Sequence, residues 1–343
     1  MGLYAEIQEQ PEVLANLLRR NEEVAAVARK ISELEPKYVF LAARGTSDNA
    51  GRYSQYLWGA YNGMPIALAT PSLFSHYKRA PRLDGALVAA ISQSGRSPDI
   101  LSVVKEGKRQ KRPVLVITNA PDSPLANQAD LLIDINTGSE KAVAATKTYT
   151  AELLALAMLS VELDDDTERR EELKRLPEWA HLVLNLDHDI ARIAERYRYM
   201  EHCVVIGRGY NYATAFEWSL KLKELTYIVA QPYSSADFLH GPVAVVDRGF
   251  PVFVIAPAGG IFPSILDVVK KAHKKGAELV IISNQNEILE LAQSPIPLPD
   301  DIPEWLSPIL AILPAQLFSY HLARTRGLDV ETPRGLSKVT KTL

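Results

Sequence analysis

The chain has 343 residues, 47% of them hydrophobic and 23% charged, and a formal net charge of −3. This is the composition of a soluble globular protein that is too long for one ordinary core, so we expect two domains. The charge balance offers no basic face for nucleic acid. The apolar run LLALAMLSVEL (153–163) is too short to span a bilayer, and the single Cys203 fits a reducing, cytoplasmic location.

In chain order, the first predicted element is an N-terminal helical segment, residues 1–29, where apolar residues recur at helical spacing. Two α/β domains are predicted after it, over residues 30–170 and 194–333. The charged stretch DDDTERREELKRL between them predicts a solvated linking helix. Residues 334–343 lose all periodicity, so we expect a C-terminal tail there.

An internal repeat organises the two domains. SPDILSVVKEGKRQKRPVLVITN (97–119) aligns without a gap on FPSILDVVKKAHKKGAELVIISN (262–284), and VFLAARG ending at Gly45 matches CVVIGRG ending at Gly209. In each copy an apolar, β-branched run is followed by a turn and an amphipathic helix, several times over. This alternation predicts a duplicated α/β fold with mostly parallel sheets between helices.

The loop SQSGRSP (92–98) distinguishes the first copy from the second, because the aligned loop PAGGIFP (257–263) has no hydroxyl side chains. One serine could serve as a helix cap, but three hydroxyls and an amide exceed that need. A strand-to-helix turn in a parallel sheet presents free N–H groups at the helix start, so Ser92, Gln93, Ser94 and Ser97 suit a phosphate monoester. A plain capped turn is the alternative.

The second copy has a different chemical signal. Glu217, Lys221 and Glu224 fall on one face of a predicted helix, where the first copy has Tyr53, Leu57 and Ala60. Taken alone, this pattern favours a surface ion-pair stripe. Metal-ligand motifs are not found, and GRGYNY lacks the third glycine of a dinucleotide-binding loop, so neither a metal nor a cofactor is expected.

RGTS, SQSGRS, FEWSLKLKELTY, HGP and PRGLSK occur in the order and near the spacing of one known family. They resemble the isomerase half of glucosamine-6-phosphate synthase, a tandem of two sugar-isomerase (SIS) domains. The resemblance covers nearly the whole chain and implies two flavodoxin-like αβα sandwiches, the first binding phosphate and the second carrying a catalytic carboxylate.

The resemblance also implies residue roles. Glu224 would carry a proton between C1 and C2 of the sugar, with Glu217 and Lys221 beside it. His240 would open the sugar ring and, in a homodimer, reach into the neighbouring subunit's site. Lys338 would close over the sugar with the tail and form a Schiff base. The implied substrate-binding residues are Thr46, Ser47, Ser92, Gln93, Ser94, Ser97 and Val143.

Departures from the family pattern limit how far its activity can be carried over. The chain shows no counterpart of the synthase's glutamine-hydrolysing domain, so we expect no use of glutamine by that route. Arg44, Arg96, Ala145 and Leu239 stand where the synthase has Cys, Glu, Ser and Lys. We therefore expect an isomerising deaminase that converts glucosamine 6-phosphate to fructose 6-phosphate and ammonia.

Two alternatives remain open. One is a deglycase of sugar-amino-acid phosphates or another amino-sugar phosphate isomerase. Arg96 would suit the deglycase, because its substrate carries an additional carboxylate. A sugar-phosphate-sensing binding module is the non-enzyme alternative. The N-terminal segment is too short and insufficiently basic for the DNA-binding helices that such regulators usually have.

Overall fold

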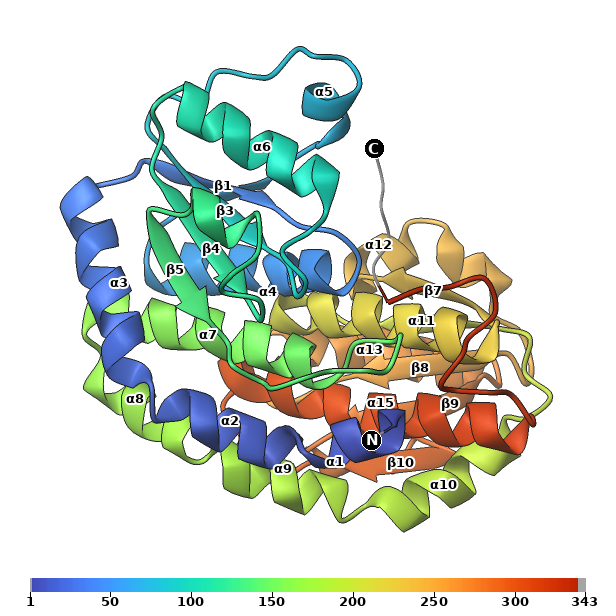
Figure 1. Ribbon diagram of the computed structural model, residues 1–343. Coiled ribbons are helices and arrows are strands. Elements are labelled where there is room, and N and C mark those ends of the chain that lie inside the picture. The colour runs from blue at the N-terminus through green and yellow to red at the C-terminus, as the bar shows by residue number, and fades with distance from the viewer. Residues whose placement is uncertain (1, 339–343) are drawn as a thin grey trace. The chain divides into compact units, whose positions relative to one another are not determined.

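The computed structural model of the chain describes residues 2–338, in which strands and helices alternate (Figure 1). The contacts divide these residues into two compact units, each of which is described by itself. The first-sheet unit comprises residues 12–141, 147–175 and 337–338. The second-sheet unit comprises residues 2–11, 142–146 and 176–336.

The first-sheet unit is built on five parallel strands in the order β2-β1-β3-β4-β5. These strands are β1 Tyr38–Ala42, β2 Ile66–Leu68, β3 Ala86–Ile91, β4 Val114–Thr118 and β5 Leu131–Asp134. The central β3, ALVAAI, is buried at every position. A continuous apolar run is what a parallel strand needs when helices cover both faces of its sheet.

Helices cover both faces of this sheet. α3 and α4 each contact α7, and these three helices lie on one face, whereas α5 and α6 lie on the other (Figure 1). α7 is buried all round from Lys147 to Val161, which explains its lack of a polar face. The helices of this unit are α2 Gln10–Leu18 (which begins at the unit boundary), α3 Asn21–Leu34, α4 Thr46–Tyr61, α5 Ser72–Ser75, α6 Pro98–Arg109, α7 Lys147–Asp164 and α8 Thr167–Lys174.

The second-sheet unit repeats this arrangement. Its parallel strands follow the order β10-β9-β8-β6-β7, which is the first order read from the other edge. They are β6 His202–Ile206, β7 Val229–Tyr233, β8 Pro251–Ile255, β9 Glu278–Ser283 and β10 Ser294–Pro297. Both sheets have the flavodoxin-like order, so the predicted duplication and fold class are confirmed.

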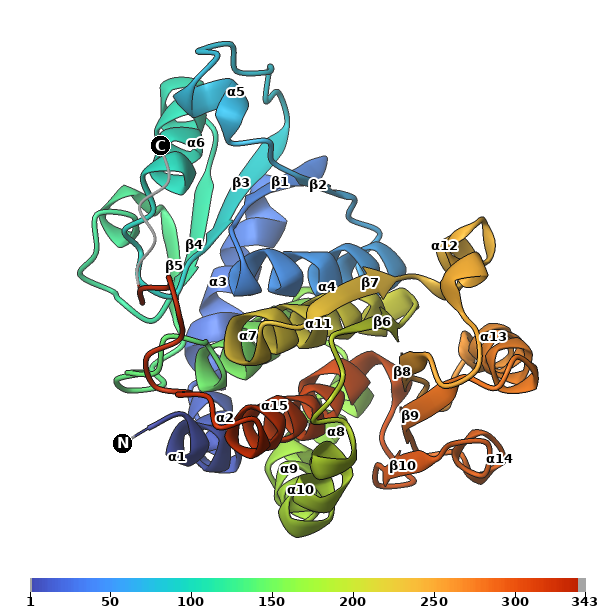
Figure 2. The same cartoon turned by 90° about the vertical axis from the view of Figure 1, so that its right-hand side faces the viewer.

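The helices of the second sheet also lie on two sides. Figure 2 shows α12, α13 and α14 on one side and α11 and α15 on the other. The apolar face of α13 joins the strand residues in one buried cluster. The helices of this unit are α1 Leu3–Gln8, α9 Leu176–Leu184, α10 Asp187–Arg196, α11 Tyr212–Thr226, α12 Ser235–Leu239, α13 Phe262–Lys274, α14 Asn286–Leu289 and α15 Ser307–Thr325.

Within the described residues, one helical stretch is long and apolar enough to cross a membrane by length and composition. It runs from Glu304 to Thr325 and includes α15, and 89% of its most apolar window is buried in the fold. It packs against α9, α10 and α11. A central helix of a layered α/β fold has this same profile, so the stretch is weak evidence for a membrane span.

Candidate active site

The serine-rich loop of the first copy connects β3 to α6 at the carboxyl edge of the first sheet. β3 is the central strand, so the loop emerges between those that follow β1 and β4. Gly95 has φ +61°, and a Cβ there would lie 2.0 Å from Ser123 Oγ. Only glycine fits this close approach, which fixes the path of the loop.

The side chains of this loop make few hydrogen bonds within the fold. Ser92 Oγ accepts a hydrogen bond from Gly95 N at 3.2 Å, and Ser94 Oγ accepts one from Arg96 N at 3.4 Å. Ser97 lies at the N-cap of α6, but its hydroxyl makes no capping hydrogen bond. No bond of the Gln93 side chain is found among residues 2–338 either. The turn is therefore not held by a serine cap, and the phosphate role of these residues stays a prediction.

The aligned loop of the second copy is filled by a carboxylate of the chain itself. Gly260 N donates to Glu304 Oε2 at 2.9 Å, and Ile261 N donates to Glu304 Oε1 at 3.4 Å. These two N–H groups align with those of Gly95 and Arg96. The loop geometry thus suits an anion, and in the second copy Glu304 is that anion. Sequence reasoning missed Glu304, because it lies more than 40 residues away and carries no motif.

Two other predicted substrate residues begin α4, after Gly45 with its φ of +55°. Thr46 is the first residue of that helix. Ser47 is buried and donates its hydroxyl proton to Glu152 Oε1 on α7 at 2.8 Å. Glu152 is a buried carboxylate that the sequence analysis did not single out. Whether Thr46 and Ser47 bind substrate stays a prediction.

The predicted carboxylate cluster lies on α11. Lys221 Nζ is 3.3 Å from Glu217 Oε1 and 2.5 Å from Glu224 Oε2. The side chains of Lys221 and Glu217 are 1% and 0% exposed, and that of Glu224 is 22% exposed. The helical spacing is confirmed, but the interpretation as a surface stripe is wrong, because Lys221 and Glu217 are buried.

Electrostatics fix the charge of this cluster. Burial by itself would lower the pKa of Lys221, but the attraction of Glu217 and Glu224 outweighs it and raises that pKa above its ordinary value. Lys221 is therefore an ammonium at neutral pH. Glu224 has its Oε2 buried against this ammonium while the side chain keeps some access to solvent. A carboxylate in such a setting is positioned by one neighbour and can still meet a substrate.

The C-terminal tail brings Lys338 to a buried carboxylate within the first-sheet unit. Lys338 Nζ donates to Glu140 Oε2 at 2.6 Å, and the Glu140 side chain is 0% exposed. Glu140 also accepts from the N and Oγ1 of Thr148 at the start of α7. Glu140 is a second residue that sequence reasoning missed.

Val143, predicted to line the sugar pocket, belongs to the segment 142–146 of the second-sheet unit and is half-buried. The buried Glu6 of α1 accepts a hydrogen bond from Ala142 N at 3.2 Å. Gln316 of α15 donates to Thr146 O at 3.5 Å. The segment is thus held from both ends, which gives the Val143 side chain a defined place.

His240 follows α12 and is exposed. Its side chain has no hydrogen bond to any of residues 2–338, and its backbone N donates to Asp237 O at 3.1 Å. Leu239 and Val245 beside it are 38% and 53% exposed. Whether His240 contacts a second subunit stays a prediction.

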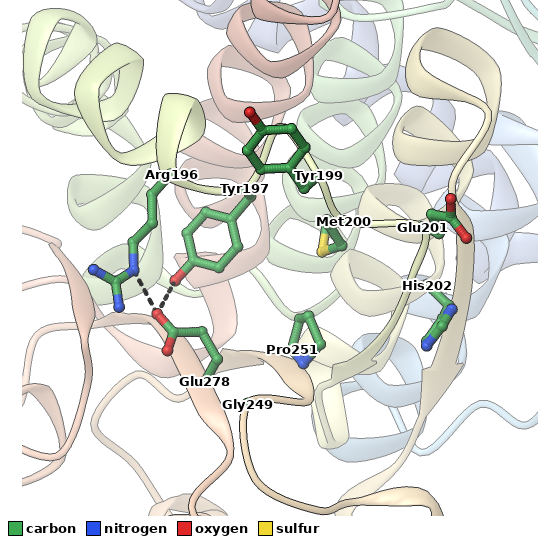
Figure 3. A pocket seen from close by; sticks show the side chains of 9 residues that line it. All are labelled: Arg196, Tyr197, Tyr199, Met200, Glu201, His202, Gly249, Pro251 and Glu278. Carbon is green, nitrogen blue, oxygen red and sulfur yellow. Dashed lines mark hydrogen bonds and ion pairs between the residues drawn. The ribbon is translucent and has the colours of Figure 1, made fainter.

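A cavity of about 560 Å³ lies at the opposite, amino edge of the second sheet (Figure 3). Arg196 and Tyr197 converge there on Glu278, at 2.6 and 3.2 Å. Burial raises the pKa of Tyr197. Its lining residues contain no predicted site residue, so this cavity is separate from the candidate site; they are Arg196, Tyr197, Tyr199, Met200, Glu201, His202, Gly249, Pro251 and Glu278.

Fold and site together define a duplicated flavodoxin-like α/β protein with a serine-rich loop after β3 in one copy and a buried carboxylate–lysine cluster in the other. The family model described as the SIS domain matches residues 34–162 and again 198–326. The chain therefore belongs to the SIS domain family, with two copies of the domain in tandem, as the sequence predicts.

Relatives of known name support this assignment. The chain is 35% identical to the glutamine–fructose-6-phosphate aminotransferase (isomerizing) of Thermococcus kodakarensis over 97% of its own length and 56% of the relative. It thus spans about half of such curated relatives.

Solved structures agree. The C-terminal domain of glucosamine-fructose-6-phosphate aminotransferase from Francisella tularensis superposes with a TM-score of 0.88 at 30% identity, covering 96% of this chain and 98% of that one. A glucosamine-6-phosphate deaminase from Thermotoga maritima shares the fold, with a TM-score of 0.79 at 22% identity and 99% coverage of both chains.

Proposed function

We propose that the protein is a sugar-phosphate isomerase that acts as an isomerising deaminase of glucosamine 6-phosphate. The overall reaction consumes water and yields fructose 6-phosphate and ammonia. The serine-rich loop binds the phosphate, and Glu224 acts as the base. The proposal is supported by homology to the isomerase half of the aminotransferases and by the chemistry of the two residue groups.

The chemistry requires a base that serves two adjacent carbons. Glu224 removes the proton from C2 of the open-chain amino sugar and returns it to C1, which converts the C2 amine to an imine. Water then adds to C2 and ammonia leaves, or the neutral Lys338 amine adds first, ammonia leaves, and water hydrolyses the resulting Schiff base to release the ketose and Lys338. His240 assists ring opening, and we propose that it does so from the second subunit of a homodimer.

One observation carries the proposal: Glu224 keeps 22% of its side chain exposed above a lysine that is 1% exposed. A binding module has no use for a base, and the first copy keeps the same fold with Tyr53, Leu57 and Ala60 at these positions. The fold thus does not require this charge cluster. Burying an ammonium costs free energy that its pairing with carboxylates only offsets, so a cluster that the fold does not require is best explained by a chemical role.

The test is Glu224→Gln, which keeps the shape of the side chain but cannot accept the proton. Ammonia release from glucosamine 6-phosphate should fall by about 10²–10⁴-fold, while affinity for sugar phosphate is retained. The control is Glu287→Gln, which changes an exposed acid of the same unit in the same way and should leave both properties unchanged.

Hydrogen exchange gives a second readout. Wild-type protein in heavy water should incorporate deuterium at C2 of recovered substrate, at least in part, and the Gln variant should not. If the wild type shows neither exchange nor turnover with any amino-sugar or fructosamine phosphate, catalysis is refuted and the sensing module takes its place.

A deglycase of sugar-amino-acid phosphates is the second candidate, and Arg96 favours it. This side chain is exposed in the serine-rich loop and has no partner among residues 2–338. A guanidinium in that position suits a substrate carboxylate. Comparing turnover of glucosamine 6-phosphate with that of fructosamine 6-phosphates that carry an amino acid decides between the two activities.

A further inference from the structure

The side chain of Arg44 reaches from the loop after β1 to the first turn of α6. Arg44 Nε donates to Asp99 Oδ2 at 2.6 Å. The Asp99 side chain is 2% exposed, and its Oδ1 accepts from Ile100 N at 2.9 Å. Arg44 is thus held against the helix that follows the serine-rich loop.

The second copy serves as an internal control for this pair. Arg208 aligns with Arg44, but Ser264 aligns with Asp99. Ser264 turns its hydroxyl to Ile261 O at 2.9 Å and offers no charge to the arginine. The fold therefore does not need the ion pair. It is present in the copy that has the serine-rich loop.

Most of the Arg44 guanidinium is left available. Among residues 2–338 its Nη1 and Nη2 atoms have no hydrogen-bond partner, and the side chain is 49% exposed. Ala42 of β1 pairs in register with Ala90 of β3. Arg44 and Ser92 each follow these paired residues by two positions, so they leave the carboxyl edge of the sheet side by side.

We propose that Arg44 is a ligand of the substrate phosphate, held in place by Asp99. The proposal rests on phosphate binding at the serine-rich loop and adds a cation to a site otherwise made of hydroxyl and backbone donors. The carboxylate of Asp99 at the start of α6 would repel a phosphate, and Arg44 neutralises it. The two free nitrogens of the planar guanidinium can then donate to two phosphate oxygens.

The experiment measures binding of inorganic phosphate and of sorbitol 6-phosphate, an open-chain ligand that has no other charge and cannot react. Arg44→Gln should weaken both about 10–100-fold and reduce the dependence of affinity on salt. Arg208→Gln, which removes the aligned arginine of the second copy, should change neither. Thermal midpoints without ligand show whether each variant is folded.

Two further variants distinguish the effect of the guanidinium's geometry from the effect of its charge. Arg44→Lys keeps the charge but loses the fork, and should bind at least threefold more weakly than wild type. Asp99→Asn removes the anchor of Arg44 but also a negative charge near the phosphate, so these two effects oppose each other and its affinity should stay closer to wild type than that of Arg44→Gln. If Arg44→Gln does not fold, the Lys variant decides, and wild-type affinity in it refutes the role of the fork.

The outcomes distinguish this proposal from the proposed function. If wild type binds phosphate and Arg44→Gln binds it equally well, Arg44 is not a phosphate ligand, while the function stands. If Arg44→Gln weakens the binding only of ligands that also carry a carboxylate, Arg44 recognises that carboxylate and not the phosphate, which also overturns the proposal. If wild type binds neither ligand, the phosphate loop and the proposed function fail together.

Discussion

Lys221 is a buried charge of the candidate site, with a side chain that is 1% exposed, and it balances two carboxylates at once. Removing an ammonium from water costs several kcal/mol, which only close pairing offsets. Both carboxylates supply that pairing: Glu217 lies 3.3 Å away and is 0% exposed, whereas Glu224 lies 2.5 Å away and keeps 22% of its side chain exposed. The division of roles leaves one carboxylate structural and the other available for chemistry.

Lys221→Met should destabilise the protein by about 3–5 kcal/mol, because it leaves the buried Glu217 without its counter-ion. Urea unfolding followed by tryptophan fluorescence measures the change. Lys223→Met, on the same helix but exposed, is the matched control and should change stability by less than about 0.5 kcal/mol. Equal effects of the two variants would contradict the structural role of Lys221.

The pH dependence follows from the raised pKa of Lys221. A lysine whose pKa is higher in the folded than in the unfolded state gives its full stabilisation below the unfolded value of about 10.4 and loses it as the pH rises through the folded value. The stability difference between wild type and Lys221→Met should therefore be constant from about pH 6 to about pH 9 and shrink above about 10.4. A difference that changes near neutral pH would refute this.

The residues of this cluster could be predicted from the sequence, but their burial could not. Spacing at i, i+4 and i+7 places Glu217, Lys221 and Glu224 on one face of a helix whatever surrounds it. What buries that face is decided by packing between segments far apart in the chain, which spacing within one helix does not reveal. The same limit hid Glu140 and Glu152, which are isolated acids in the sequence and acquire meaning only from their partners.

At the scale of elements, the loop between β8 and α13 is occupied by a carboxylate of the protein itself. Glu304 places its two oxygens on the N–H groups of Gly260 and Ile261. A Cβ at Gly259 would lie 2.2 Å from this carboxylate, so the loop and Glu304 fit each other closely. We therefore expect one phosphate per chain in the wild type.

Glu304→Ala should open the second loop to an external oxyanion. The variant should lose about 1–3 kcal/mol of stability, and phosphate or sulfate should restore part of it. The measurement is the thermal midpoint against phosphate concentration, in a Ser92→Ala, Ser94→Ala background that weakens the first loop. Glu287→Ala, an exposed acid of the same unit, is the control. Failure of phosphate to stabilise Glu304→Ala more than its parent would show that the loop is not an anion site.

The tail is the second element whose function can be separated from the fold. Deleting residues 334–343 removes Lys338 from Glu140 and should abolish turnover, while the protein stays folded and phosphate affinity stays close to wild type; the thermal midpoint should fall because Glu140 loses its cation. Lys338→Arg is the sharper companion, because it keeps a cation for Glu140 but cannot form a Schiff base. Full activity of the truncated protein would remove Lys338 from the mechanism.

At the scale of the whole molecule, most of the architecture could be predicted from the gapless repeat. The aligned segments 97–119 and 262–284 became α6 with β4 and α13 with β9, and both sheets took the same strand order. The repeat could not reveal that residues 2–11 and 142–146 join the second-sheet unit. Those memberships follow from contacts between residues far apart in the chain, such as α1 with α15 and Glu6 with Ala142, which leave no periodic pattern.

The proposed dimer can be tested by mixing two inactive variants. If His240 of one subunit serves the site of the other, co-expressed Glu224→Gln and His240→Ala chains form heterodimers that each contain one intact site. Half of the dimers are then heterodimers, so activity should return to about a quarter of wild type. If every site uses its own His240, the mixture stays as inactive as its components. Chains mixed without subunit exchange are the control.

The membership of α1 in the second-sheet unit has a consequence for how the chain matures on the ribosome. α1 contacts α15, which is synthesised about 300 residues later. At about 5–20 residues per second, the apolar face of α1 waits roughly 15–60 s for its partner. Chaperones that bind nascent chains should therefore bind α1 early in synthesis and release it late. Slowing translation before α15 should lengthen the time for which the apolar face of α1 is exposed.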